Sequence, residues 1–148
     1  MSQKIEDFVP VVKYHGLNTA KAIATSSSVL SSSAIAGIGY ATGSGGAVTQ
    51  STSKATGVTL SKVTGTITTH AAELAAATEV SFIVTNTAVA ITDVIVLSIQ
   101  SGGTSGEYQA TVTDVGAGTF DITIANLTAG ALSDSLLINF AVIKGVVA

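Results

Sequence analysis

The sequence predicts an all-β protein, a β-sandwich or barrel preceded by an extended N-terminal arm. Short segments of alternating polar and apolar residues recur from about Ala47 to the C-terminus, and glycines separate them. Only 10% of the residues are charged, against about 25% in an ordinary soluble domain. Hydrophobic residues make up 47% of the chain, which contains no cysteine, tryptophan or arginine. This composition favours a structural β-protein that hides surface in an assembly.

The N-terminal part, residues 1–37, is expected to form an extended arm and a serine-rich linker before the sandwich domain of residues 38–148. Pro10 fixes its own φ and pushes Val9 toward an extended conformation, which disfavours a long helix. Residues 25–33 include six serines and have the composition of a flexible linker. An apolar cluster beside a proline can add to a neighbouring sheet edge, so the expected anchors of the arm on a partner are Phe8, Val9, Val11, Val12 and Tyr14. The alternative is a tail without fixed structure.

Four segments of the sandwich domain alternate with a period of two and are expected to be strands with one wet face. They are residues 58–60, 80–85, 108–113 and 119–126, and such a series of short strands is typical of a sandwich or barrel. The alanine-rich run 71–77 is the one helix-like segment. Seven residues are too few for a helix that is stable in isolation, so a strand edge or a loop is expected there.

Two further segments, residues 93–99 and 136–143, are apolar on both faces. A strand of this kind belongs either at the centre of a sheet, covered by other elements, or at a subunit interface. In the second segment, Leu137, Phe140 and Ile143 are the predicted subunit contact. A simple core role is an equally good interpretation of these three residues.

Charge and hydropathy exclude several classes of partner. The net charge is −3, so no basic patch is expected that would neutralise the phosphates of a nucleic acid. No run of about 20 apolar residues is present to span a membrane. The first residues lack the cationic and apolar stretches of a secretory signal, which favours synthesis in the cytosol.

The residues offer little for catalysis, and no catalytic residue, cofactor or metal site is expected. His70 with Glu73 and Glu79 is a conceivable metal site, but such a site usually needs three or four ligands that supporting residues hold in place, so a histidine in solvent at a strand end is the favoured interpretation. Asp114 and Asp121 flank a predicted hairpin turn and are an example of a carboxylate pair that could in principle cleave a glycosidic bond. Solvated acids are the usual finding at such a turn, so the enzymatic interpretation is the weaker one.

Three stretches carry a resemblance to a known group of proteins. They are GYATGSGGAVTQSTSKATGVTLSK at residues 39–62, GTITT at 65–69 and INFAVIK at 138–144. Together they resemble the small virion proteins of tailed bacteriophages and prophages, over about residues 38–145. The resemblance implies a structural role without catalytic residues. The best-understood relatives for comparison are capsid decoration, or cement, proteins, which sit on the outside of the head as jelly-roll oligomers, so the resemblance implies a jelly-roll-like β-sandwich for this chain.

This resemblance implies a homodimer or homotrimer that is made in the host cytoplasm and binds the major capsid protein on the capsid surface of the virion. The alternative is a tail or receptor-binding module that contacts a host surface glycan. Sugar-binding modules usually expose aromatic side chains, and the chain has three tyrosines, four phenylalanines and no tryptophan. The sequence therefore favours the head shell over the tail.

Overall fold

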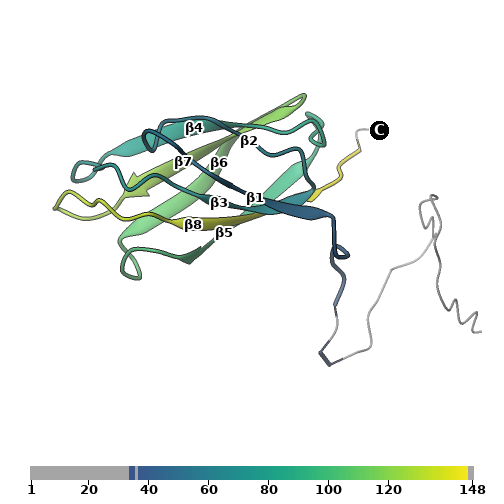
Figure 1. The fold of residues 1–148 in the computed structure, drawn as a ribbon, viewed down its shortest axis with the longest axis horizontal. Helices are drawn as coiled ribbons and strands as arrows, with labels where there is room; N and C mark the ends of the chain where they lie inside the picture. The colour runs from purple at the N-terminus through teal and green to yellow at the C-terminus, as the bar shows by residue number, and fades with distance from the viewer. Residues whose placement is uncertain (1–33, 36, 147–148) are drawn as a thin grey trace, which may run out of the picture. The chain divides into compact units, whose positions relative to one another are not determined.

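The computed structural model describes residues 34–35 and 37–146, and these fold into two four-stranded β-sheets (Figure 1). The described residues contain eight strands and no helix, so the all-β prediction is confirmed. Contacts within the chain group Gly39–Ala148 into one compact unit. The expected anchors of the arm, Phe8, Val9, Val11, Val12 and Tyr14, lie outside the described residues.

Sheet A has the strand order β1-β3-β8-β5. These strands are β1 (Gly45–Thr49), β3 (Thr64–Thr68), β8 (Leu137–Ile143) and β5 (Val94–Ser101). Strand β8 is central and runs antiparallel to both β3 and β5, whereas β1 is parallel to β3. The sheet therefore ends at β1 on one side and at β5 on the other.

Sheet B has the strand order β2-β4-β7-β6. These strands are β2 (Val58–Thr59), β4 (Glu79–Thr85), β7 (Thr119–Asn126) and β6 (Tyr108–Gly116). Strand β7 is antiparallel to β4 and β6, and the two-residue β2 is parallel to β4. In the described part, β6 and β7 are the only consecutive strands that pair in one sheet, through a turn in which Gly118 has a φ of +82°.

The hydrophobic core lies between the two sheets. Each strand turns its alternate residues inward, as the period-two pattern predicted. The rings of Phe120 on β7 and Phe140 on β8 meet at 5.4 Å between centroids and so join the two layers. The other fully buried side chains include Ile67, Val84, Ile122, Ile124, Leu136, Ile138 and Val142.

The expectations for the individual segments are largely confirmed. The four alternating segments form β2, β4, β6 and β7 or parts of them. Residues 71–77 are a loop whose Leu74 makes an isolated bridge to Leu132. Of the two segments that are apolar on both faces, 136–143 contributes the central strand β8, and 93–99 contributes the edge strand β5. The edge position leaves β5 without the neighbour that would cover its second side.

Candidate functional site

The outer surface of sheet A carries no charged side chain, and we call it the sheet A face. The register of the sheet aligns its residues in rows, for example Thr64 beside Ala141 and Val96. The charged residues of the described chain all lie outside β1, β3, β5 and β8. The members of the sheet A face are Gly45, Ala47, Thr49, Thr64, Thr66, Thr68, Leu137, Asn139, Ala141, Ile143, Val94, Val96 and Ser98.

The side chains of the sheet A face divide into a polar and an apolar half. Strand β3 contributes only threonines, and Thr66 donates a hydrogen bond from Oγ1 to Oδ1 of Asn139 at 3.0 Å. On the other side, Val94 pairs directly with Ile143 across the β5–β8 ladder. Val94, Val96 and Ile143 are each about half exposed, with exposed fractions of 57%, 49% and 56%. The exposed apolar surface therefore lies on β5 and the neighbouring end of β8.

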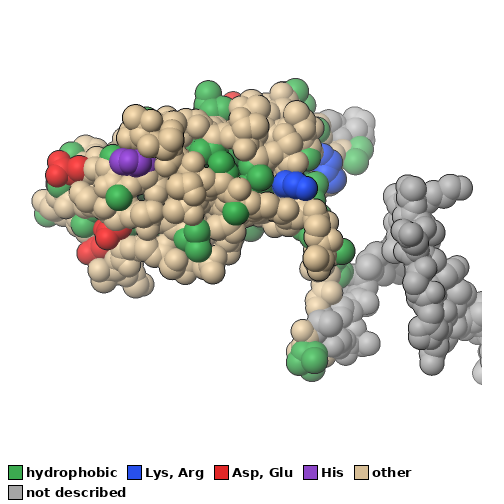
Figure 2. Space-filling model, in the orientation of Figure 1, with side chains coloured by type: hydrophobic (Ala, Val, Ile, Leu, Met, Phe, Trp, Pro, Cys, Tyr) green, Lys and Arg blue, Asp and Glu red, His purple; other side chains and the backbone are tan. Residues whose placement is uncertain are grey.

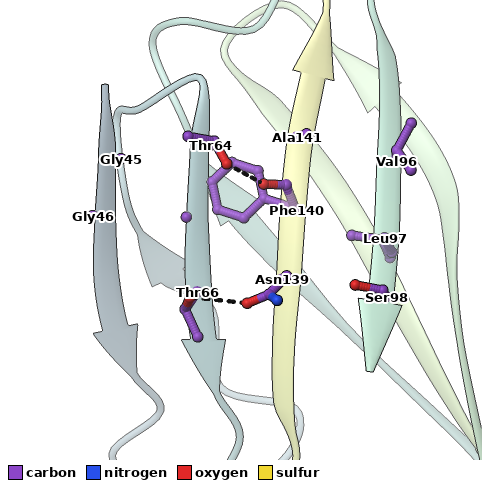
Figure 3. A pocket seen from close by; sticks show the side chains of 11 residues that line it. Gly45, Gly46, Thr64, Thr66, Val96, Leu97, Ser98, Asn139, Phe140 and Ala141 are labelled. Atoms are coloured by element: carbon purple, nitrogen blue, oxygen red, sulfur yellow. Dashed lines mark hydrogen bonds between the residues drawn. The ribbon is translucent and has the colours of Figure 1, made fainter. Parts of the chain in front are cut away.

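A shallow hollow of about 420 Å³ lies in the middle of the sheet A face. Figure 3 shows it between β1 and β5, where Gly45, Ala141 and Ser98 provide only small side chains. Thr64 donates a hydrogen bond from Oγ1 to the carbonyl oxygen of Phe140 at 2.9 Å, which satisfies this hydroxyl within the sheet. The hollow contains no ionisable group, so it offers shape and apolar contact rather than acid–base chemistry.

The outer surface of sheet B, the sheet B face, has a different character. Three acids lie on it, Glu79, Asp114 and Asp121. Hydroxyl groups link its strands, because Thr123 on β7 bonds both Ser81 on β4, at 2.7 Å, and Thr113 on β6, at 2.9 Å. The sheet B face therefore carries negative charge and presents polar groups to water. Figure 2 shows that, on the visible side of the molecule, charged side chains lie mostly toward the two ends.

The predicted subunit contact of Leu137, Phe140 and Ile143 does not form one surface. Phe140 points inward and is 2% exposed, so within this chain it is a core residue. Leu137 and Ile143 lie on the sheet A face, because they are an odd number of residues from Phe140 along an alternating strand. Two of the three residues are thus available for contact with a partner, and Phe140 is not.

The carboxylate pair predicted at the hairpin is present as a pair. Asp114 and Asp121 are direct neighbours in the β6–β7 register, next to the irregularity between Val112 and Asp114. They lie on the sheet B face and do not line the hollow of the sheet A face. Their placement beside a turn is the solvated arrangement that the sequence favoured.

The candidate metal ligands are not brought together. Among the described residues, no group of three or more His, Cys, Asp or Glu side chains is placed to hold a metal ion. His70 uses Nδ1 to accept a hydrogen bond from the backbone N–H of Ala72 at 2.9 Å. His70 therefore shapes its own loop.

A buried lysine was missed by sequence reasoning. Lys54, in the loop after β1, is 3% exposed, and its Nζ donates to the carbonyl oxygens of His70 and Asp134. Its ammonium group also lies 6.0 Å from the centre of the Tyr108 ring. Burial lowers the pKa of Lys54, and the nearby charge of Asp134 opposes this shift. The lysine joins three loops that cross between the sheets at one end of the sandwich.

A second ionic contact fixes the start of β5 to the end of β8. Lys144, just after β8, forms a salt bridge with Asp93, just before β5. Asp93 also accepts hydrogen bonds from the backbone N–H groups of Ala90, at 2.8 Å, and Gly145, at 3.1 Å. The bond from Ala90 is the largest cause that lowers the pKa of Asp93, followed by the bond from Lys144. No local sequence pattern signals this contact, because 51 residues separate the two partners.

The tyrosines considered for glycan binding are placed differently from one another. Tyr108 is buried beneath the loop after β5, and its hydroxyl donates to Asp134 Oδ2 at 3.2 Å. Tyr40 is partly exposed, and its hydroxyl donates to the carbonyl oxygen of Val142. Tyr14 lies outside the described residues. The described part thus offers one partly exposed tyrosine, which is already held by a backbone group.

Comparison with known proteins adds no assignment to these observations. In the described residues, no helix has the length and apolar character needed to cross a bilayer. Searches with family models, curated proteins and solved structures found no match to this chain.

Proposed function

We propose that this chain is a capsid decoration protein of a tailed bacteriophage, which binds the outside of the head shell as a homo-oligomer and stabilises it. Its partners would be the major capsid protein and other copies of itself, and it would act without catalysis or a cofactor. The protein would be made in the host cytoplasm and reside on the capsid surface. The proposal starts from the sequence resemblance to small virion proteins.

The observation that supports this proposal best is the sheet A face. A whole sheet surface without charge, with half-exposed Val94, Val96 and Ile143 at one side, is the kind of surface that proteins cover in an assembly. The sheet B face, with its three acids, is suited to remain in water. A protein with one surface for contact and one for solvent fits a role as a subunit of a particle.

The finer description of the sandwich as a jelly roll also belongs to this proposal. Jelly rolls consist of eight strands in two antiparallel sheets. The four pairs that involve β7 or β8 are antiparallel as in a jelly roll, whereas the pairs β1–β3 and β2–β4 are parallel. What the proposal needs is the two-layer sandwich, and the parallel edge pairs are a departure from the jelly-roll pattern.

The N-terminal arm is the proposed attachment to the shell. An extended segment can be ordered on its partner, where a wide contact offsets the entropy lost. Deletion of residues 1–21 should leave a folded sandwich that no longer binds heads. A change of Phe8 and Tyr14 to Ala in the full chain should weaken binding in the same direction. Full occupancy of heads by both variants would show that the arm is not the anchor.

The experiment that tests the function is to separate heads from tails of the parent phage on a density gradient. The amount of this protein in each fraction is then measured by mass spectrometry. Hundreds of copies with the heads are the expected result for a decoration protein. A few copies that remain with the tails would overturn the proposal and favour the receptor-binding alternative.

A further inference from the structure

Among the described strands, β5 at the edge of sheet A has a pairing partner on one side only. β5 is the last strand in the order β1-β3-β8-β5, so within residues 34–35 and 37–146 it pairs with β8 alone. Eight residues, Val94–Ser101, form this edge, and they include no charged residue and no proline. The unpaired N–H and C=O groups of such an edge are a template for another strand. We call this feature the β5 edge.

The other three edges of the sandwich are protected in ways that β5 is not. β1 has five residues and β2 only two, and short edge strands offer little to pair with. β6 is long, but it carries Asp114 and has a register shift between Val112 and Asp114, and a charge and a bulge both discourage pairing. The register shift in β5 comes only at its end, between Ile99 and Ser101.

The side chains beside the β5 edge favour an apolar partner. Val94 and Val96 project onto the sheet A face from the edge strand itself, and Ile143 of β8 lies directly beside Val94. All three side chains are about half exposed. A strand that pairs with β5 would cover this row with its own outward side chains, so those side chains should also be apolar and uncharged.

We propose that the occupant of the β5 edge is β5 of a second copy of this chain. Two β5 strands would pair antiparallel across a two-fold axis and join the two A sheets into one eight-stranded sheet. Such a contact is self-complementary, as a two-fold interface requires. This inference rests on the proposed function, whose homo-oligomer it defines as a dimer.

The sequence of β5 allows this pairing without a mismatch of faces. Side chains alternate between the two faces of a strand, so an even-numbered residue of one β5 must lie opposite an even-numbered residue of the other. Val94, Val96 and Ser98 then remain on the outer face in both copies. No charge then meets a like charge, since β5 contains none. The nearest charged group, Asp93, is already paired with Lys144, and the antiparallel arrangement places the two copies of this pair at opposite ends of the new ladder.

The test is sedimentation velocity of the purified full chain over a range of concentrations, with two lysine variants. Val96→Lys places a charge at the β5 edge, and Ile83→Lys is the matched control on the sheet B face. The control residue is 52% exposed against 49% for Val96, and both changes add the same charge. The wild type and Ile83→Lys should be dimers, whereas Val96→Lys should dimerise roughly tenfold more weakly or not at all.

Several results would overturn the inference. They are a wild type that is monomeric or trimeric at all concentrations, a dimer that Val96→Lys leaves intact, or one that Ile83→Lys weakens equally. Circular dichroism checks that the variants are folded, and Ser98→Lys replaces Val96→Lys if that chain does not fold. Hydrogen exchange of the wild type gives an independent readout, because amides of β5 should exchange more slowly as the dimer forms. Exchange in β5 that does not change with concentration would also refute the pairing.

Failure of this inference and failure of the proposed function give different results. The oligomeric state is measured on purified protein without any particle, whereas the function is measured by the fraction of the phage that contains the protein. A monomer that is found on heads refutes only the dimer. A dimer that is found on tails refutes only the decoration role.

Discussion

The two outer faces of the sandwich are built on similar four-stranded sheets, yet they differ in almost every surface property. The strands of sheet A contain no charged residue, and their outward side chains are apolar, small, hydroxyl-bearing or, at Asn139, an amide. The strands of sheet B carry Glu79, Asp114 and Asp121 on their outer face. Both sheets bury an apolar inner face, so the difference is confined to their outer surfaces.

This comparison teaches that the few charged residues of a weakly charged protein can be confined to one sheet and the loops, so that the other sheet is left without charge. The described part has three lysines and seven acids, and all of them lie in sheet B or in the loops. The ion pair of Lys144 with Asp93 and the buried Lys54 hold the ends of the sandwich together. Sheet A is left as a continuous uncharged surface, which we propose is covered in the assembled protein.

The largest expected effect is the difference in stability lost when an inward and an outward side chain of β8 in sheet A are truncated. Phe140→Ala should destabilise the protein by about 3–5 kcal/mol, since it removes a buried ring that packs on Phe120. Ile143→Ala, on the outer face of the same strand, should change the free energy of unfolding by less than about 1 kcal/mol. Urea denaturation of the two variants measures the contrast. Equal losses would contradict the division of β8 into a core side and a contact side.

The next effect concerns the end at which loops from both sheets meet. Lys54→Ala should cost about 1–3 kcal/mol, because the carbonyl oxygens of His70 and Asp134 would lose their donor. Lys62→Ala is the control, since the Lys62 side chain is exposed and its Nζ makes only a 3.5 Å contact with the carbonyl oxygen of Gly43. Thermal denaturation of both variants provides the comparison. A loss no greater than that of the control would show that Lys54 does not stabilise these loops.

The third effect is a pH dependence of stability, which we expect from the Asp93 carboxylate at one end of sheet A. The pKa of Asp93 lies below its ordinary value of 3.8, so its carboxylate stabilises the fold above that pH. This stabilisation should be lost as the pH falls through the lower pKa of the folded state. Melting temperatures between pH 2 and 7 should therefore fall more steeply on acidification for the wild type than for Asp93→Asn. Parallel curves for the two proteins would contradict this role of Asp93.

The smallest expected effect comes from repulsion between two acids on the sheet B face. Asp114 and Asp121 are like charges directly opposite each other, so Asp114→Asn should stabilise the protein by roughly 0.2–1 kcal/mol. The gain should shrink at high salt, which screens exposed charges. Denaturation midpoints at low and high salt test this, and association with heads should not change. Loss of a glycan-cleaving activity in this variant would instead support the enzymatic interpretation.

The strand pattern was predictable because it depends on local alternation. Val80, Phe82 and Val84 were expected on one face of a strand, and the structure places all three toward the interior to different degrees. The same reasoning identified residues 93–99 and 136–143 as apolar on both faces. It did not separate Phe140 from Leu137 and Ile143, although their odd spacing along a strand contains that information.

The sequence by itself determined the all-β class and the alternating faces of four segments that became strands or parts of strands, because period-two alternation and composition are local properties. Only the tertiary structure decided that β8 is central and β5 is an edge, since strand order depends on pairings between distant segments. It also decided that Lys54 is buried and that Asp93 meets Lys144. Local sequence cannot specify these contacts, because the partners are far apart in the chain and meet only when the whole chain has folded.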